Sequence, residues 1–203
     1  QACVNAEIEA QKAGDIATMR SAADLLISDH KDAPEAAVGA WTAATQFQGM
    51  GLFAEAATYH EVLAERFPKS EHAKDAAFNG VLLRTTVGDY DKAIESYNEA
   101  VKLNPSDSVV YHNRGNAYAN KRDIDRAIAD QNQAIKLNAN YAMAYNDRGL
   151  AYGARGDIGH ALADFDQSIK LDGRNTLAYY NRGLTLRNRG EIERAIADFD
   201  AAI

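Results

Sequence analysis

The sequence predicts an all-α protein built from stacked helix pairs, chiefly because it repeats every 34 residues. The triplets Asn113-Arg114-Gly115, Asp147-Arg148-Gly149 and Asn181-Arg182-Gly183 recur at that spacing. A fixed period of this length indicates units that bury their apolar faces on their neighbours. Abundant alanine and only three prolines favour helix over sheet. Such an array presents a surface to a partner and seldom builds a catalytic pocket.

Each of the last three repeats divides into two helices at a short turn, because apolar residues recur at helical spacing on both sides of it. Turns such as Gly156-Asp157 place a glycine, which can end one helix in the left-handed conformation, before an aspartate that caps the next. Arg122 replaces this glycine in one turn, so we expect slight strain there. The predicted helices span 109–121 and 124–137, 142–155 and 158–171, and 176–189 and 192 onward.

The same turn and second helix recur upstream with a looser period. Gly88, Gly51 and Gly14 begin comparable segments at intervals of 37 residues. The sequence therefore predicts about six helix pairs in one continuous domain, 1–203. We expect a degenerate or capping pair at 1–33, longer repeats at 34–73 and 74–106, and regular repeats at 107–140, 141–174 and 175–203, the last one truncated.

Composition narrows the classes of function. The net charge is −7 at pH 7, and Lys and Arg form no cluster able to bind phosphates, which argues against a nucleic-acid partner. No apolar run approaches the length of a membrane span, so we expect no membrane insertion. The single cysteine, Cys3, excludes an internal disulfide. Because the chain starts without Met and stops at Ile203 inside a predicted helix, we expect it to be part of a longer protein.

No motif predicts catalysis, a metal or a cofactor. The five histidines include no pair at i, i+3 or i+4, which is the spacing that a helix needs to bind a metal. P-loop, Gly-x-Gly and nucleophile-elbow motifs are also absent from the sequence. We therefore predict that the protein is not an enzyme.

The residues of the regular repeats resemble the signature of a known protein family. Tyr111, Gly115, Tyr118, Ala127, Ala134 and Leu137, with Pro105 before them, lie at the signature spacings of the tetratricopeptide repeat (TPR). One departure is Gln131, where the family usually has an aromatic residue. The resemblance implies a right-handed α-α solenoid. Residues 67–78 are similar to TPR proteins of the bacterial cell envelope, which leaves bacterial periplasm or cytoplasm open and leans toward the periplasm.

The resemblance also implies a concave groove that is lined by the first helix of each pair. The corresponding positions mix apolar side chains with amides, which suits an apolar helix or an extended peptide whose backbone bonds to Asn. A competing interpretation is that residues such as Leu150 and Leu184 pack only against the neighbouring first helix. The predicted groove residues are Val109, His112, Asn116, Asn120, Met143, Asn146, Leu150, Ala154, Leu177, Tyr180, Leu184, Arg187 and Asn188.

Some TPR grooves clamp a C-terminal carboxylate with cationic side chains. The corresponding set here contains no cation, and Asp147 would repel an anion, so we expect no such clamp. Its members are His112, Asn116, Asp147, Leu177 and Asn181.

The arginine of each repeat triplet is followed sixteen residues later by an aspartate. We interpret these pairs as a structural ladder between first and second helices rather than a binding stripe, because a binding site rarely needs the same pair in every unit. Such pairs fix register more than they add stability, since desolvation offsets most of the attraction. The three pairs are Arg114 with Asp130, Arg148 with Asp164, and Arg182 with Asp198.

Together these observations predict a non-catalytic scaffold that binds a peptide or helix of a partner protein in its concave groove. An alternative is a self-associating assembly module, in which Ala195, Phe199 and Ile203 at an open C-terminal edge contact another copy. A third hypothesis is a regulatory TPR domain of a larger protein.

Overall fold

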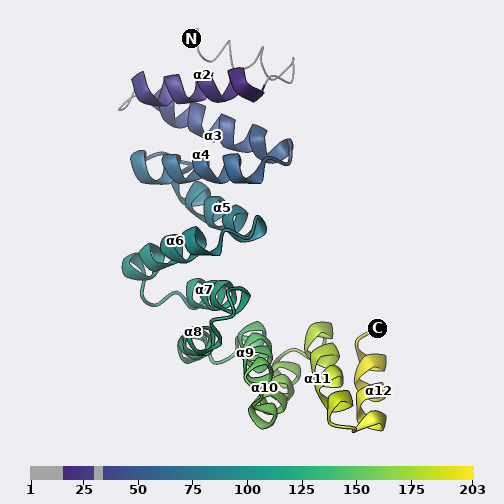
Figure 1. The fold of residues 1–203 in the computed structure, drawn as a ribbon. Coiled ribbons are helices and arrows are strands. Elements are labelled where there is room, and N and C mark those ends of the chain that lie inside the picture. The colour runs from purple at the N-terminus through teal and green to yellow at the C-terminus, as the bar shows by residue number, and fades with distance from the viewer. Residues whose placement is uncertain (1–15, 30–33) are drawn as a thin grey trace. The chain divides into compact units, whose positions relative to one another are not determined.

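The computed structural model describes residues 16–29 and 34–203, which contain eleven α-helices and no strand (Figure 1). Cys3, Gly14 and Asp15 lie outside the described part. The helices are α2 (Ile16–Asp29), α3 (Pro34–Gly49), α4 (Phe53–Arg66), α5 (Ala73–Thr86), α6 (Tyr90–Leu103), α7 (Ser108–Asn120), α8 (Ile124–Leu137), α9 (Ala142–Ala154), α10 (Ile158–Leu171), α11 (Thr176–Asn188) and α12 (Ile192–Ala201).

These helices belong to two compact units, which are residues 1–93 and 94–203. The boundary falls inside α6. In the first unit α3 packs on α2 and α4, and α4 packs on α5. In the second unit each helix from α7 to α12 packs on the next one along the chain. The predicted organisation as successive helix pairs is therefore present in both units, while a single continuous domain stays a prediction.

Alanines and the aromatic residues Phe47 and Tyr59 form much of the core of the first unit. Ala40, Ala44 and Phe47 lie buried along α3, where small side chains let the neighbouring helices approach closely. His60 on α4 is fully buried, and neither of its ring nitrogens has a hydrogen-bond partner. Its ring meets the edge of Trp41 at a centroid distance of 5.3 Å. Burial lowers the pKa of His60 to about 4, because a charged imidazole would lose its hydration there.

In the second unit, the glycine of each repeat triplet lies where the first helix meets the second. A Cβ at Gly149 would be 2.7 Å from Cε1 of Phe165, and one at Gly183 would be 2.8 Å from Cε1 of Phe199. Real Cβ atoms do not approach other atoms so closely, so glycine allows these helices to touch. The recurrence of glycine in every repeat triplet is explained by this contact.

The turns between paired helices have the predicted backbone. Gly156 and Gly190 have φ of 86° and 83°, in the left-handed region that ends a helix. Arg122 has φ of 64° at the equivalent position, which confirms the expected strain. Asp157 caps α10 by accepting a hydrogen bond from the amide of His160. In the structure, the first helix of each regular repeat ends one residue before its predicted end, because the last predicted residue is the C-cap.

The arginine ladder of the second unit is confirmed by the side-chain contacts. Nε and Nη2 of Arg148 donate to the two oxygens of Asp164 at 2.7 and 2.6 Å, and Nη1 donates to Asn132 of the preceding second helix. Arg148 therefore joins three helices. The pairs of Arg114 and Arg182 repeat this geometry. The hydrogen bond to Asp164 raises the pKa of the Arg148 guanidinium, so the ladder stays charged at any physiological pH.

Candidate functional site

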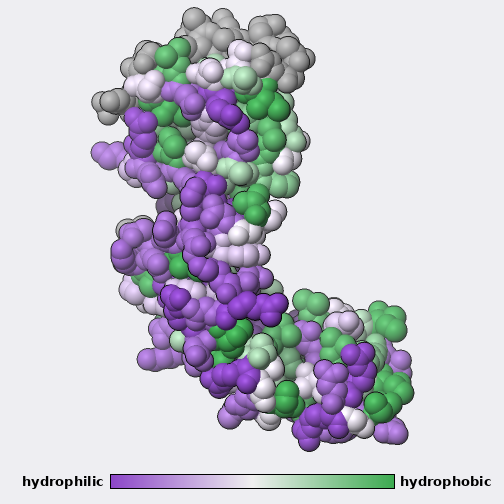
Figure 2. Space-filling model, viewed as in Figure 1, coloured by the Kyte–Doolittle hydropathy of each residue, from purple (hydrophilic) through white to green (hydrophobic). Residues whose placement is uncertain are grey.

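The exposed apolar side chains of the second unit include a repeated position near the start of its first helices. Val109, Met143 and Leu177 are spaced 34 residues apart on α7, α9 and α11. They and two further predicted groove residues, Leu150 and Tyr180, are between 47% and 61% exposed. Large apolar side chains that remain this accessible on one set of helices indicate a contact surface. Figure 2 shows hydrophobic side chains interrupting the hydrophilic surface over α11 and α12.

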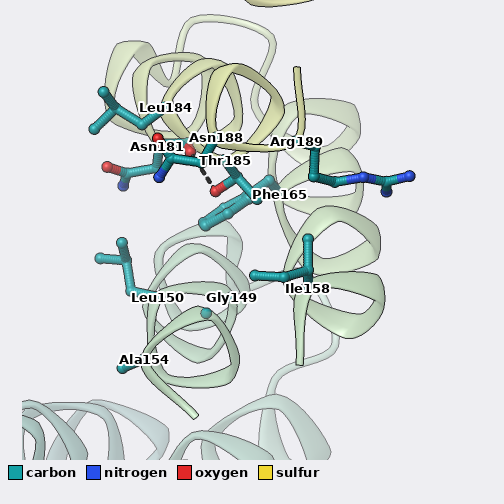
Figure 3. Close-up of a pocket in the computed structure, with 11 residues that line it drawn as sticks. Gly149, Leu150, Ala154, Ile158, Phe165, Asn181, Leu184, Thr185, Asn188 and Arg189 are labelled. Carbon is teal, nitrogen blue, oxygen red and sulfur yellow. Dashed lines mark hydrogen bonds between the residues drawn. The ribbon is translucent and has the colours of Figure 1, made fainter. Parts of the chain in front are cut away.

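A pocket of about 320 Å³ lies between α9, α10 and α11. Figure 3 shows Leu150 and Ala154 on α9 and Leu184 and Asn188 on α11, with the Phe165 ring of α10 between these helices. Because Gly149 has no side chain, the Phe165 ring can form part of the pocket wall. The other lining residues are Gly153, Ile158, Asn181, Thr185 and Arg189. The pocket is therefore mainly apolar, with amide and hydroxyl groups and Arg189 at its α11 side.

A network of polar side chains begins at the junction of α7 and α8. Nε2 of Gln131 donates to Oδ1 of Asn116 at 2.8 Å and to the backbone oxygen of His112 at 3.2 Å. Oε1 of Gln131 lies 3.2 Å from Nδ1 of His112. Both Gln131 and His112 are buried, so these bonds replace the water that their polar atoms lose. Gln131 thus fills a position where an aromatic residue was expected.

The network continues from α7 to α9 and α11. Nδ2 of Asn116 donates to Oδ2 of Asp147 at 2.9 Å, and Nδ2 of Asn146 donates to Oδ1 of the same carboxylate at 2.9 Å. Nδ2 of Asn181 donates to Oδ1 of Asn146 at 3.0 Å. Because Asn181 also lines the pocket, the network reaches from α7 to the pocket wall.

Asp147 is the charged centre of this network. Its side chain is 21% exposed, and its Oδ2 lies 3.6 Å from Nε2 of His112. Burial, together with the negative charges of Asp147 and Asp107, raises the pKa of the neighbouring Tyr141 hydroxyl. Tyr141 is therefore a neutral hydrogen-bonding group near the network at physiological pH.

The structure brings some predicted groove residues together and separates others. His112, Asn116 and Asn146 share the polar network, whereas Leu150, Ala154, Leu184 and Asn188 share the pocket. Asn120 is exposed and donates to the backbone oxygen of Asn116, and Arg187 is exposed near the end of α11. Leu150 and Leu184, for which packing alone was the competing interpretation, both line the pocket, and their role in binding stays a prediction.

The network and the pocket also contain residues that were not among the predicted groove residues, including Gln131, Asp147, Phe165 and Asn181. Gln131 had a usable signal, since a glutamine at an aromatic position has to find hydrogen-bond partners if it is buried. Asp147 and Asn181 belonged to the rejected clamp set. Because that set was judged only by its lack of cations, the hydrogen bonds of both residues to Asn146 were not considered. Phe165 lies on a second helix, outside the positions that the family resemblance considers.

Within residues 16–29 and 34–203, no cluster of three or more His, Cys, Asp or Glu side chains is arranged to hold a metal ion. No helix in the same ranges has both the length and the apolar character needed to cross a bilayer.

The successive helix pairs, touching at glycine, define a helical-repeat protein. Models of the TPR family match residues 87–121, 109–141 and 146–203, so the chain belongs to the tetratricopeptide repeat family. Members of this family are typically non-catalytic protein-interaction modules.

Solved structures share the fold. A TPR protein from Parabacteroides merdae is 18% identical, with a TM-score of 0.68 over 97% of this chain and 75% of that one. MamA from Desulfovibrio magneticus is 16% identical, with a TM-score of 0.68 over 82% of this chain and 92% of that one. YrrB, described as a TPR protein with an unusual peptide-binding site, is 19% identical, with a TM-score of 0.60 over 89% of this chain and 92% of that one.

Proposed function

We propose that this TPR protein is a non-catalytic scaffold that binds a peptide or helix of a partner protein on the first-helix surface of residues 94–203. The observation that carries the proposal is the apolar pocket between Leu150, Phe165 and Leu184, with exposed Met143 and Leu177 on the same first helices. An apolar side chain of a partner that enters this pocket would lose its hydrated surface, at about 25 cal/mol per Å². The peptide-binding site named for YrrB supports this class of function.

The rigidity of the site also supports peptide binding. Asn116, Asn146 and Asn181 are already held by side-chain hydrogen bonds, so little ordering entropy is lost when a ligand binds. A peptide backbone exposes N–H and C=O groups that unused amide donors and acceptors in this network can satisfy.

The test is photo-crosslinking from two positions of matched exposure. A benzoylphenylalanine is placed at Leu177 on α11 or at Ile196 on α12, which are 61% and 54% exposed. Each protein is irradiated in extract of the source cells, and crosslinked peptides are sequenced. We expect a partner segment to crosslink at Leu177, to be absent at Ile196, and to be lost when Leu150→Glu is added. A segment that is retained in the Leu150→Glu protein would contradict binding in the pocket.

Self-association is a second candidate function, favoured by the exposed pair Ile192 and Ile196, one turn apart on α12. Two copies that bury these side chains against each other would gain apolar contact in both chains. Sedimentation velocity is measured for the protein and for Ile196→Glu at concentrations from about 1 to about 100 µM, a range suited to weak dimers. Concentration-dependent association that Ile196→Glu abolishes would support this candidate, and a monomer throughout the range would refute it.

A further inference from the structure

We propose that the groove selects a partner segment that carries an arginine or lysine close to an apolar residue, and that Asp147 determines this preference. The inference rests on the proposed function, because it names the chemistry of the segment that the same site binds. The apolar residue enters the pocket beside Leu150 and Leu184, and the cation meets the Asp147 carboxylate.

Asp147 differs from the three buried aspartates of its unit in what holds it. Asp130, Asp164 and Asp198 each receive two hydrogen bonds from an arginine, which neutralises their charge. Asp147 receives its two hydrogen bonds from the neutral amides of Asn116 and Asn146. No Lys or Arg in the described ranges forms an ion pair with it; Nε2 of His112 lies 3.6 Å from its Oδ2, and the nearby Tyr141 hydroxyl is uncharged. Its negative charge is therefore not neutralised by an arginine or lysine of the described ranges.

The geometry leaves this carboxylate able to bind a further donor. An ionised carboxylate offers about four lone-pair positions, and the two amides use one on each oxygen. The side chain is 21% exposed, so a donor can reach it from solvent. A charged donor gives a stronger bond than a neutral one and restores charge balance at a site that is shielded from water on its other side.

Asp147 is also linked to the apolar pocket by side chains. Asn146 donates to Asp147 and accepts from Asn181, and Asn181 lines the pocket. A short peptide whose apolar side chain lies in the pocket can thus place a neighbouring long cationic side chain at the carboxylate. The chain's net charge of −7 would in addition steer a basic partner toward the protein.

Arg187 is the cation among the predicted groove residues, and it does not oppose this preference. It lies six residues beyond Asn181 on α11, about 9 Å further along the helix axis at 1.5 Å per residue, and on the repeat after that of Asp147. Its side chain is exposed to solvent, where salt screens its repulsion of a cation at Asp147. Arg189, which lines the pocket, is paired with Glu191 at 3.1 Å.

The test uses synthetic nine-residue peptides with leucine at the fifth position and glycine and serine elsewhere. One arginine is moved through the eight remaining positions, and matched series carry glutamine or glutamate instead. Binding is measured by fluorescence polarisation at low and high salt. We expect at least one arginine position to bind about tenfold more tightly than its glutamine match, as for one charge-assisted hydrogen bond, and the advantage to shrink in salt.

Two variants with the same change in charge separate the site from the general field. Asp147→Asn should remove the arginine preference, whereas Asp125→Asn, at an 87% exposed position on α8, should retain it. Circular dichroism checks that both fold. Equal preference in wild type and Asp147→Asn would overturn the role of Asp147, and an absence of any arginine preference in wild type would overturn the proposal even if Asp147→Asn failed to fold.

The failure of the underlying function gives a different result. If leucine peptides bind and Leu150→Glu abolishes their binding, but arginine, glutamine and glutamate are equivalent, then the groove binds peptides and only the cation preference is wrong. If no peptide of any series binds, or if Leu150→Glu binds them unchanged, then both the preference and peptide binding in this groove are overturned.

Discussion

Replacing Gly149 with alanine tests the contact between first and second helices most directly. The new Cβ would lie 2.7 Å from Cε1 and 3.0 Å from Cδ1 of Phe165, and 3.1 Å from the backbone oxygen of Ala161. Optimal carbon–carbon separations are about 3.5–4.0 Å, so the ring must move by up to about 1 Å. Phe165 is only 1% exposed, so a shift of its ring disturbs the side chains that are packed against it.

The magnitude follows from two opposing terms. Overpacking a well-packed contact costs about 1–3 kcal/mol. Alanine is favoured over glycine inside a helix by about 1 kcal/mol. Gly149→Ala should therefore lower the free energy of unfolding by roughly 0–2 kcal/mol. Gly149→Leu adds more atoms at the same place and should be more destabilising.

Gly153→Ala is the matched control, four residues further along the same helix. Its Cβ would meet nothing nearer than Cβ of Ala161 at 4.0 Å, which is an ordinary contact. It should gain up to about 1 kcal/mol, so the two variants should differ by about 1–3 kcal/mol. Urea unfolding followed by circular dichroism measures both, because the single tryptophan, Trp41, lies in the other unit. Equal stabilities for the two variants would refute the close approach of α9 and α10 at Gly149.

Three further predictions concern stability, and urea unfolding tests each of them. Arg122→Gly should stabilise by about 0.5–1 kcal/mol, because relief of left-handed strain exceeds the added freedom of the unfolded chain; a loss of stability would contradict this. Arg148→Met should cost about 3 kcal/mol by leaving the buried Asp164 unpaired, and the double variant Arg148→Met/Asp164→Leu should recover most of it; a double variant as unstable as the single one would contradict the ladder argument. Between pH 6.5 and 4 His60 is protonated in the unfolded chain but not in the folded one, so the free energy of unfolding should decrease by up to about 3 kcal/mol as the pH is lowered. His60→Leu should reduce this pH dependence; an unchanged pH dependence would assign it to other groups.

The 34-residue period predicted the helices of the second unit to within one residue, because helix periodicity and turn chemistry are both local. The glycine contacts and the arginine ladder were also predictable, since they join residues at a constant separation in every repeat. The ladder arginine and its aspartate are always sixteen residues apart. Features that recur in register are thus visible in a single sequence.

The polar network was not predictable in this way, because its bonds join different positions of neighbouring repeats. Asn116 reaches Asp147 over 31 residues, and Asn181 reaches Asn146 over 35. Neither separation equals the period, so comparing repeats in register does not reveal these contacts. Which amide meets which carboxylate depends on how side chains extend between adjacent first helices, and that requires the packed structure.

One register position nevertheless explains why the site has a polar part and an apolar part. Gln131, Phe165 and Phe199 are equivalent residues 34 apart, and each lies against the glycine of its own repeat. Where this residue is Gln131, the first helix carries Asn116, which accepts a hydrogen bond from it. Where it is Phe165 or Phe199, the first helix carries a leucine at the position of Asn116, namely Leu150 or Leu184.

The residue behind the glycine therefore sets the chemistry that the first helix presents. A buried glutamine needs a polar neighbour, because an unpaired amide would cost about 1–3 kcal/mol, whereas a phenylalanine ring needs none and leaves room for an apolar wall. This coupling places the charged centre at Asp147 next to a repeat with glutamine and the apolar pocket between the two repeats with phenylalanine. A segment that pairs a cation with an apolar side chain matches the junction of these two kinds of repeat, which is where Asn116 meets Asp147.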